Sequence, residues 1–390
     1  MKPRLAITLV STVLAILVVW TALRLRAEQN ISVSTDLRPV HDLLSSRAEE
    51  RAGERAVLAG TRRLVREPID EASARILFPS LTQGTDIFDP VLYVRRRPEM
   101  RDFRRLRAHP RKGWVLRTND IGIRRDGPIS AERPDVRVLV AGDSHTEGVC
   151  DNKDSFAGRL EARLQAERPG ETVEVVNLGK GGTAMYRYLA ALEGFLELKP
   201  DVFIVCVYDG NDYVEGLLLK RYFEREVYPD HGPGYGERMQ AANQASPTAL
   251  AQALGQAAYF ADLPQEEAVA IDAAVAVAEE IQRVCRENDI ELLIATLAPP
   301  RREWLAAQGR QFVGAARELG IDPWDRSISD RLSAEFRARV AALGIEAVDV
   351  RPAFEGESDL YWDRDFHLNL RGNERVADVL LPALRRRLER

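Results

Sequence analysis

The sequence predicts an α/β fold, a flavodoxin-like three-layer α/β/α sandwich around a mainly parallel sheet. From residue 136 to the carboxyl end, short apolar and β-branched runs alternate with helix-compatible stretches. Several of these runs stop at glycine or at a small polar cluster, which is typical of buried parallel strands that lead into a helix. The connections are short, and strands joined through helices in this way pair in parallel with right-handed crossovers.

The chain begins with a segment that predicts a membrane anchor. Residues 5–23 are uncharged and almost wholly apolar, and the segment is long enough for a helix to cross a bilayer. Trp20 and Arg24 stand where a cleaved signal peptide would have small residues. We therefore expect an uncleaved single-pass anchor over residues 1–26, a cytoplasmic amino terminus and a periplasmic body. Basic residues flank both ends of the span, so the charge pattern leaves the orientation open.

Residues 27–133 predict a juxtamembrane helical stalk followed by a small β-rich lead-in. The stalk is rich in Arg, Glu and Ala, has apolar residues at roughly helical spacing, and is interrupted by Pro68. Beyond residue 77, short apolar pieces are broken by Pro, Gly, Asp and Asn, which indicates small strands or hairpins. Arg-rich patches here would suit acidic lipid head groups or a polyanion; a solvated face is the other interpretation.

The largest part of the chain, residues 134–390, begins with three predicted strands, at 136–142, 173–177 and 202–208. Helices are expected between them. Ser144 follows the first strand, Gly181 and Gly182 follow the second, and Asn211 follows the third. Parallel strands end on one rim, which is where open α/β sheets bind their ligands. The topology therefore predicts that these residues lie close together.

Residues 213–263 break the alternation of strands and helices. An insertion directly after a candidate site residue is expected to form a lid that shapes the pocket, with an ordinary surface excursion as the alternative. The alternation then resumes, with helices at 265–287, 301–319 and 330–343, strands at 290–296 and 345–350, and a last helix that runs to the carboxyl end. We find no internal repeat.

The composition limits the classes of partner. The chain has 390 residues, of which 45% are hydrophobic, enough for one large domain and a smaller appendage. The net charge of −5 shows no excess of Lys and Arg, so nucleic acid is not an expected partner. Cys150, Cys206 and Cys285 are too few and too irregularly spaced for a metal knuckle or a disulfide framework. A single disulfide between two of them is the remaining alternative, although Cys206 lies in an apolar run and is expected to be a core residue.

A serine nucleophile needs a base, a carboxylate that orients the base, and donors for the oxyanion. Ser144 stands at a turn that can expose its hydroxyl while backbone N–H groups converge on an anion. Among the five histidines, only His367 lies in a loop between a late strand and the last helix, where it can reach the same rim. Asp365 and Asp363 are both close enough to orient it, and we favour Asp365. Polar turn residues that cap a helix are the alternative.

Four blocks together resemble the SGNH (GDSL-type) hydrolase superfamily. They are GDSHTEG at 142–148, NLGKGG at 177–182, GND at 210–212 and DFHLN at 365–369, in the order that the family shows. The resemblance covers residue 136 to the carboxyl end. The stretch TNDIGIR at 118–124 is also similar to the segment that often precedes the first block in bacterial members.

The resemblance implies an oxyanion hole with three donors. Ser144 would be the nucleophile and would contribute its own N–H. Gly182, five residues after Asn177, matches the family's glycine, and Gly181 is its competitor. The side-chain amide of Asn211 would supply the third donor.

The resemblance also implies that His367 deprotonates Ser144 and then protonates the leaving alcohol, with Asp365 holding the imidazole. The chain departs from the family pattern twice. Asp209 stands where the third block usually has glycine, which puts the local backbone in doubt. Arg364 stands where the fourth block often has its aspartate, so the orienting role passes to Asp365. His145 is expected to be only a neighbour shaped by the turn.

We therefore expect a membrane-anchored serine esterase that works through an acyl-serine intermediate without metal or cofactor. The expected substrates are O-acetyl or other acyl esters on cell-envelope glycans, with acyl lipids second. Transfer to a sugar hydroxyl would begin with the same acyl-enzyme. A non-catalytic module for polysaccharide assembly is the alternative from another class, and the complete set of Ser144, Asn211 and His367 argues against it.

Overall fold

The computed structural model describes residues 38–52, 64–300, 304–306 and 309–389. All of them belong to one unit, Ser34–Arg390. The predicted membrane anchor, residues 1–26, lies outside the described residues, as does the first part of the predicted stalk. None of the helices within the described ranges is both long and apolar enough to span a bilayer.

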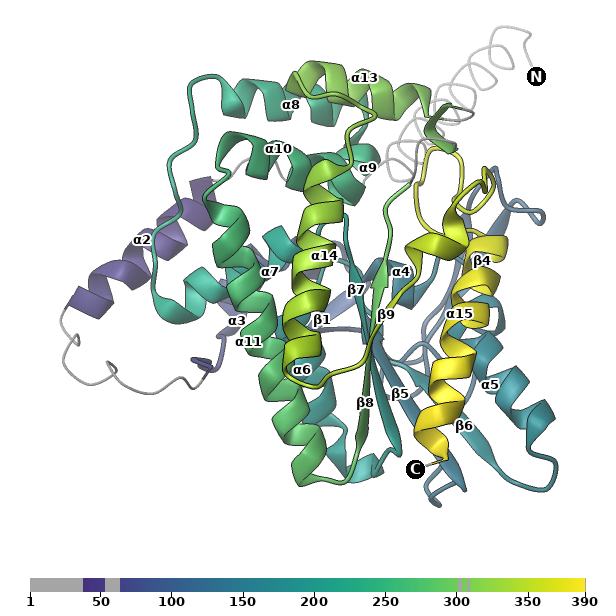
Figure 1. Ribbon diagram of the computed structural model, residues 1–390. Helices are drawn as coiled ribbons and strands as arrows, with labels where there is room; N and C mark the ends of the chain where they lie inside the picture. The colour runs from purple at the N-terminus through teal and green to yellow at the C-terminus, as the bar shows by residue number, and fades with distance from the viewer. Residues whose placement is uncertain (1–37, 53–63, 301–303, 307–308, 390) are drawn as a thin grey trace, which may run out of the picture. The chain divides into compact units, whose positions relative to one another are not determined.

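Five parallel strands form the central sheet, in the order β6-β5-β7-β8-β9 (Figure 1). They are β5 (Val136–Gly142), β6 (Val173–Asn177), β7 (Val202–Tyr208), β8 (Glu291–Leu297) and β9 (Ala347–Asp349). This is the flavodoxin-like order, in which the first strand lies between the second and the third. The prediction of an α/β fold with a mainly parallel sheet is confirmed.

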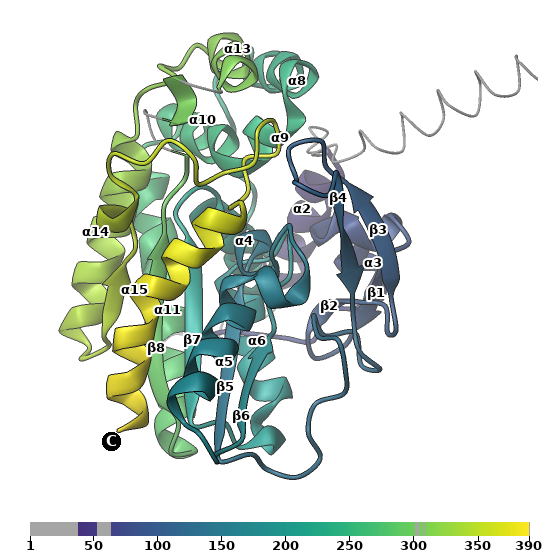
Figure 2. The same ribbon diagram turned by 90° about the vertical axis from the view of Figure 1, so that its right-hand side faces the viewer.

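Alternating side chains of the central strands enter two hydrophobic clusters, one on each face of the sheet. On β5, Leu139 and Ala141 belong to one cluster and Val138 and Val140 to the other, as the two-residue period of a strand requires. Every residue of β5 and β7 is buried because helices cover both faces (Figure 2).

The helices divide between these two clusters. The first cluster contains α6 (Met185–Gly194), α7 (Asp212–Glu224), α11 (Glu266–Glu287) and α14 (Ser327–Ala342). The second contains α5 (Phe156–Glu167), α13 (Arg310–Leu319) and α15 (Leu370–Leu388). Of the helix expected over 301–319, the part described as α13 begins at Arg310.

The lead-in contains two antiparallel hairpins, which lie next to each other (Figure 2). They are β1 (Asp86–Asp89) with β2 (Tyr93–Arg96), and β3 (Arg101–Arg105) with β4 (Gly113–Arg117). Two helices, α2 (Arg38–Ala52) and α3 (Glu71–Leu77), and a 3-10 turn, η1 (Pro79–Thr82), precede them. Leu44 of α2 and Val94 of β2 are fully buried in the first cluster. The lead-in and the described part of the stalk therefore share their core with the sheet.

The insertion after β7 folds into helices. It contains most of α7, then α8 (Tyr235–Ala245), α9 (Pro247–Ala249), a π-helical turn, η4 (Leu250–Leu254), and α10 (Gly255–Asp262). Ala242, Leu250 and Leu254 are buried in the second cluster. The helix α8 packs against α13, as Figure 1 shows. The insertion is thus part of the folded body, and η4 is the piece that reaches the rim of the sheet.

Candidate active site

The turn that carries Ser144 has room for nothing larger than glycine at its first position. A Cβ on Gly142 would lie 2.0 Å from Thr146 Oγ1 and 2.9 Å from the carbonyl oxygen of Cys206 on the neighbouring strand. Asp143 then adopts an extended conformation and caps the short helix α4 (Ser144–Glu147), its carboxylate accepting the N–H of His145 at 2.9 Å. The strand therefore ends abruptly, with Ser144 as the first helical residue.

The structure brings Ser144, His367 and Asp365 together. Ser144 Oγ lies 2.8 Å from His367 Nε2, and His367 Nδ1 lies 2.8 Å from Asp365 Oδ1. Asp363, the alternative orienting residue, has a side chain that is 46% exposed and pairs with Arg364 instead. The contacts form one continuous series from carboxylate to imidazole to hydroxyl, which is the arrangement that activates a serine.

A strained loop presents His367. Arg364 and Phe366 have positive φ angles of 65° and 67°, which bulky residues rarely adopt. Packing of the Phe366 ring against Trp304, at a centroid distance of 5.4 Å, holds this conformation. A bridge between Tyr361 and Leu368 closes the loop. The residues immediately before and after His367 are therefore both held in place, and this fixes the position of the imidazole.

The surrounding charges favour one base. Burial lowers the pKa of His367, but the Asp365 carboxylate, with Asp143 and Glu147 further away, outweighs burial and raises it above the usual value. Burial and the charge of His367 hold the pKa of His145 well below the usual value. His145 is thus a neutral neighbour, and its ring stacks on Tyr208 at 3.8 Å.

The two candidate glycines differ in their surroundings. The N–H of Gly181 donates to Glu147 Oε2 at 2.9 Å and is already engaged. Gly182 has a φ of +70° and open space where a Cβ would stand. This geometry favours Gly182 as the oxyanion donor, in agreement with the family pattern.

Asn211 is the N-cap residue of α7, and its amide nitrogen has two acceptors. Nδ2 donates to Glu215 Oε1 at 2.9 Å and to the carbonyl oxygen of Ala251 at 3.3 Å. The carbonyl oxygen of Ala251 can only accept, so the nitrogen and not the oxygen of the amide must face it. Burial, followed by the Asp143 charge, raises the pKa of Glu215 to about 8. Ala251 belongs to η4, so the insertion reaches the predicted oxyanion donor.

Gln252, the next residue of η4, contacts His367, the predicted base, and nothing in its sequence context singled it out. Its Nε2 lies 3.1 Å from His367 Nε2, and its Oε1 lies 2.8 Å from His145 Nε2. In the third block, glycine stands at position 210 and not at 209, and the contacts of Gln252 give a reason for this. A Cβ on Gly210 would lie 2.2 Å from the carbonyl oxygen of Gln252. The glycine thus stands where the insertion crosses the strand end.

The neighbouring Asp209 takes the position where the family usually has glycine, and its side chain is fully buried. It accepts the hydroxyl of Tyr213 at 3.2 Å. Burial raises the pKa of this carboxyl to about 7, against the opposing effect of nearby donors. Asp209 is therefore part of the packing beneath the site and does not face Ser144 in any contact that the structure shows.

The segment TNDIGIR braces the turn after Ser144. The side chain of Arg124 is buried and donates to the carbonyl oxygens of Gly148, at 3.0 Å, and Cys150, at 2.8 Å. Asn119 accepts the N–H of Ile123 at 2.8 Å, which closes the turn that carries this arginine. The lead-in segment thus supports the first block directly.

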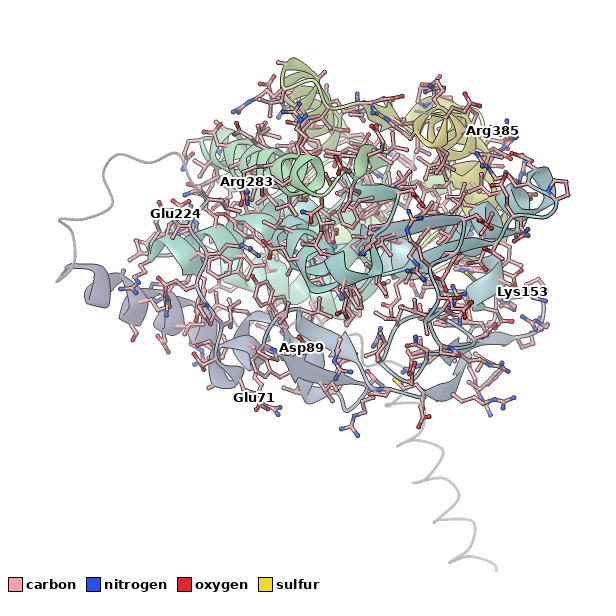
Figure 3. The ribbon with its side chains drawn as sticks, turned by 90° about the horizontal axis from the view of Figure 1, so that it is seen from below. Glu71, Asp89, Lys153, Glu224, Arg283 and Arg385 are labelled. Carbon is pink, nitrogen blue, oxygen red and sulfur yellow. The ribbon has the colours of Figure 1, made fainter. Side chains whose placement is uncertain are left out.

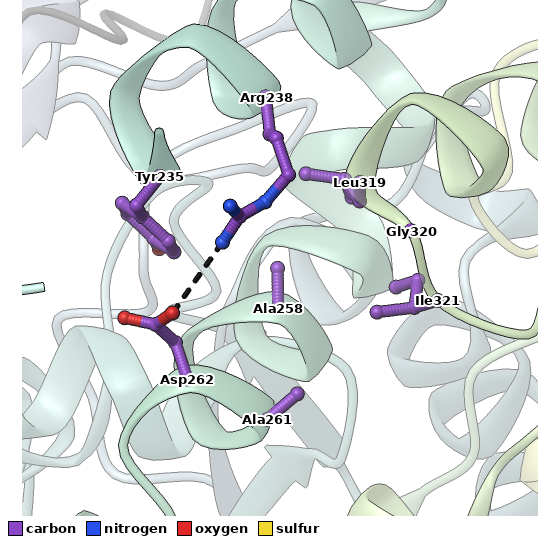
Figure 4. A pocket seen from close by; sticks show the side chains of 8 residues that line it. All are labelled: Tyr235, Arg238, Ala258, Ala261, Asp262, Leu319, Gly320 and Ile321. Atoms are coloured by element: carbon purple, nitrogen blue, oxygen red, sulfur yellow. Dashed lines mark hydrogen bonds and ion pairs between the residues drawn. The ribbon is translucent and has the colours of Figure 1, made fainter. Parts of the chain in front are cut away.

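The three cysteines and His231 take no part in the contacts that join Ser144, His367 and Asp365. Cys150, Cys206 and Cys285 are free and buried, so the bridge left open above is not formed. His231 pairs with Asp262 in the insertion, at 2.9 Å. Near that pair is a pocket of about 350 Å³, in which Arg238 and Asp262 lie 3.4 Å apart (Figure 4). None of the predicted catalytic residues lines it.

The model of the GDSL-like lipase/acylhydrolase family matches residues 140–375, which is more than half of the chain. The chain therefore belongs to this family, and it is a hydrolase that acts on ester bonds. A comparison with curated proteins found no match.

Several solved structures are similar in fold. They include the acetyl xylan esterase AlAXEase, at 18% identity and a TM-score of 0.38, over 64% of this chain and 100% of that chain. Another is the lipase Lip_vut3 from a goat rumen metagenome, at 16% identity and a TM-score of 0.39, over 64% and 97%. A lipase/acylhydrolase from Enterococcus faecalis has 16% identity and a TM-score of 0.36, over 65% and 96%. These likenesses are too distant to indicate a substrate.

Proposed function

We propose that this chain is a serine esterase that cleaves a small acyl ester, such as an O-acetyl group, through an acyl intermediate on Ser144. The observation that carries the proposal is the pair of 2.8 Å contacts that join Asp365, His367 and Ser144. In the first step, His367 Nε2 takes the hydroxyl proton while Ser144 Oγ attacks the carbonyl carbon. Asp365 holds the imidazolium that forms.

The tetrahedral intermediate carries a negative oxygen, and donors near Ser144 suit it. They are the N–H groups of Ser144 and Gly182 and the Nδ2 of Asn211. His367 then gives its proton to the alcohol oxygen as the carbon–oxygen bond breaks. Water repeats the sequence on the acyl-serine and releases the acid; a sugar hydroxyl in place of water would yield a transferred acyl group.

We further propose a cell-envelope glycan as the substrate, with acyl lipids second. The support is the apolar segment at residues 5–23, which suits a single-pass anchor with the catalytic part on the periplasmic side. A membrane-tethered esterase meets polymers and lipids of the envelope rather than soluble cytoplasmic esters. Nucleic acid is not a proposed partner, and protein partners are left unassigned.

The test uses the full chain in detergent, with a Ser144→Ala variant as control. We expect the native chain to hydrolyse 4-nitrophenyl acetate and to react with a fluorophosphonate probe, and the variant to do neither. Labelling that persists in the variant would remove Ser144 as the nucleophile. A native chain inert to both reagents would favour the assembly module.

A second assay distinguishes hydrolysis from transfer. An O-acetylated glycan is incubated with the native chain, with and without a deacetylated sugar acceptor, and free acetate and acetylated acceptor are quantified. Release of acetate alone supports the esterase. Acetylated acceptor as the main product would show a transferase that uses the same acyl-enzyme.

A further inference from the structure

A network of four charged groups, three of them buried and Arg96 partly buried, connects the lead-in hairpin to the loops of the candidate active site. Arg96 of β2 binds Glu147 with two nitrogens, at 2.6 and 2.9 Å, and Asp86 of β1 with a third, at 2.8 Å. Lys180 Nζ binds the other oxygen of Asp86 at 2.9 Å. Two cations and two carboxylates thus balance one another. Glu147 follows Ser144 on α4, and Lys180 precedes the two glycines.

The network ends on the two peptide groups of Gly181, the second of which joins it to Gly182. Lys180 Nζ donates to the carbonyl oxygen of Gly181 at 2.7 Å, and Glu147 accepts the Gly181 N–H at 2.9 Å. The carbonyl of Gly181 and the N–H of Gly182 belong to one planar trans peptide, so they point in opposite directions. An ammonium that fixes the carbonyl oxygen therefore also fixes the direction of the Gly182 N–H. It polarises the same peptide toward a stronger donor.

The loop has little freedom to adopt another position. A Cβ on Gly179 would lie 2.3 Å from the backbone nitrogen of Glu147, so the loop lies directly against α4. The side chains of Asp86, Lys180 and Glu147 are 0%, 3% and 6% exposed. Buried ion pairs of this kind contribute little net stability compared with apolar packing. What the network does supply is a fixed geometry for the loop.

We propose that Asp86 and Arg96 of the lead-in hairpin are positioning residues of the esterase: acting through Lys180 and Glu147, they aim the Gly182 N–H at the oxyanion. The inference rests on the proposed function, because it assigns a role within the oxyanion hole. It makes the hairpin part of the catalytic apparatus, although the family match begins only at residue 140.

The principal test is a Lys180→Met variant of the full chain, which keeps an unbranched side chain as far as Cε and removes the ammonium. An oxyanion donor acts mainly in the transition state, so its misalignment lowers kcat and leaves KM almost unchanged. We expect kcat for 4-nitrophenyl acetate to fall by about 10- to 100-fold, less than the loss of a whole donor. Phenylboronic acid, which adds to the serine oxygen as a tetrahedral anion, should bind more weakly by a similar factor.

Asp86→Asn tests the hairpin itself, and Arg96→Lys keeps the charge but loses the forked contact with Glu147. We expect both to lower kcat, and a double Asp86→Asn/Lys180→Met variant to lose no more than Lys180→Met alone, since the two act through one contact. These two hairpin variants also carry the test if Lys180→Met does not fold.

The matched control is Arg95→Gln. Arg95 pairs with Asp89 at 2.9 Å on the same hairpin without touching the glycine loop, and Figure 3 labels Asp89. We expect its kcat to stay within about twofold of the native value. Folded Lys180→Met and Asp86→Asn variants with native kcat, beside an active native chain, would overturn this inference alone. A native chain without esterase activity or probe labelling would overturn the proposed function first, and this inference with it.

Discussion

At the scale of single residues, the deciding atom is Nε2 of His367. Its ring partner Nδ1 faces a carboxylate that can only accept, so Nδ1 carries the proton and Nε2 presents a lone pair. Two donors face that lone pair, Ser144 Oγ at 2.8 Å and Gln252 Nε2 at 3.1 Å. A single lone pair accepts only one strong hydrogen bond at a time. The amide from the insertion therefore competes with the serine for the base.

Removal of this competitor should make Ser144 more reactive. In a Gln252→Leu variant, we expect the rate of fluorophosphonate labelling to rise by roughly 2- to 10-fold, the value of one net hydrogen bond. Gln256→Leu is the control, because Gln256 donates to the carbonyl oxygen of Asp209 at 2.7 Å and forms no hydrogen bond with His367 in the part of the chain that the structure describes. That variant should melt at a lower temperature with its labelling rate unchanged. A slower reaction in Gln252→Leu would mean that the amide supports the base.

The Asp365 carboxylate should set the acid limb of the pH profile. The base must be neutral to act, so kcat/KM rises as the pH passes the pKa of His367, which the nearby carboxylates raise above its usual value. In Asp365→Asn, we expect that limb to move to lower pH and the plateau to fall by roughly 10³- to 10⁴-fold. Asp363→Asn should change neither. An unchanged limb in Asp365→Asn would show that another group sets it.

At the scale of elements, the insertion and the end of β7 are built around one close approach. Gly210 lies under the carbonyl oxygen of Gln252, and a Cβ there would also lie 2.4 Å from the Tyr208 ring. Backbone and a buried ring cannot yield as a flexible side chain would. The placement of η4 against the predicted catalytic residues thus depends on the absence of a side chain at Gly210.

A Gly210→Ala substitution should therefore disturb η4. We expect a loss of about 1–3 kcal/mol in the free energy of unfolding, measured by urea denaturation, with reduced activity. Gly216→Ala on the following helix is the control. A Cβ there meets nothing within 4 Å, so alanine should leave stability equal or raise it by about 0.5–1 kcal/mol. Equal stability of the two variants would contradict the close approach.

The elements whose signal is local could be predicted from the sequence. The apolar runs of β5 and β7 predicted buried strands, and the ends of these strands predicted one rim for Ser144 and Asn211. His367 followed from its position before the last helix. Gln252 could not be found, because it meets His367 across 115 residues with no spacing that marks the pair. The ion pair between Arg96 and Glu147 joins residues 51 positions apart, and no sequence pattern marks it either.

At the scale of the whole molecule, the lead-in is continuous with the catalytic part. Tyr93 of β2 packs on Phe223 of α7 at a centroid distance of 6.1 Å, and Leu44 of α2 is fully buried beside them in one cluster. Arg47 lies over the Tyr222 ring at 4.2 Å. A stalk would be solvated on all sides, so the described part of this segment belongs to the body.

A fragment that starts at residue 134 should therefore fail. We expect it to aggregate or to melt without a cooperative transition, because the core cluster loses the apolar residues of α3 and β2 and Glu147 loses its partner. A fragment of residues 34–390 should melt cooperatively and retain esterase activity. Circular dichroism and sedimentation compare the two. A soluble, active fragment from residue 134 would show that the hairpins are dispensable.

In the proposed reaction, the carbonyl oxygen of Ala251 competes with the ester oxygen for the side-chain amide of Asn211. The Asn211 hydrogen that faces this carbonyl, at 3.3 Å, cannot serve a second oxygen at the same time. In the proposed reaction, an arriving ester exchanges one neutral acceptor for another, which is nearly thermoneutral, whereas an anionic oxygen forms the stronger bond. The bond to the Ala251 carbonyl therefore offsets the attraction of the Asn211 amide for an uncharged ester oxygen. The Asn211 amide then favours the substrate oxygen only when that oxygen becomes negatively charged in the tetrahedral intermediate.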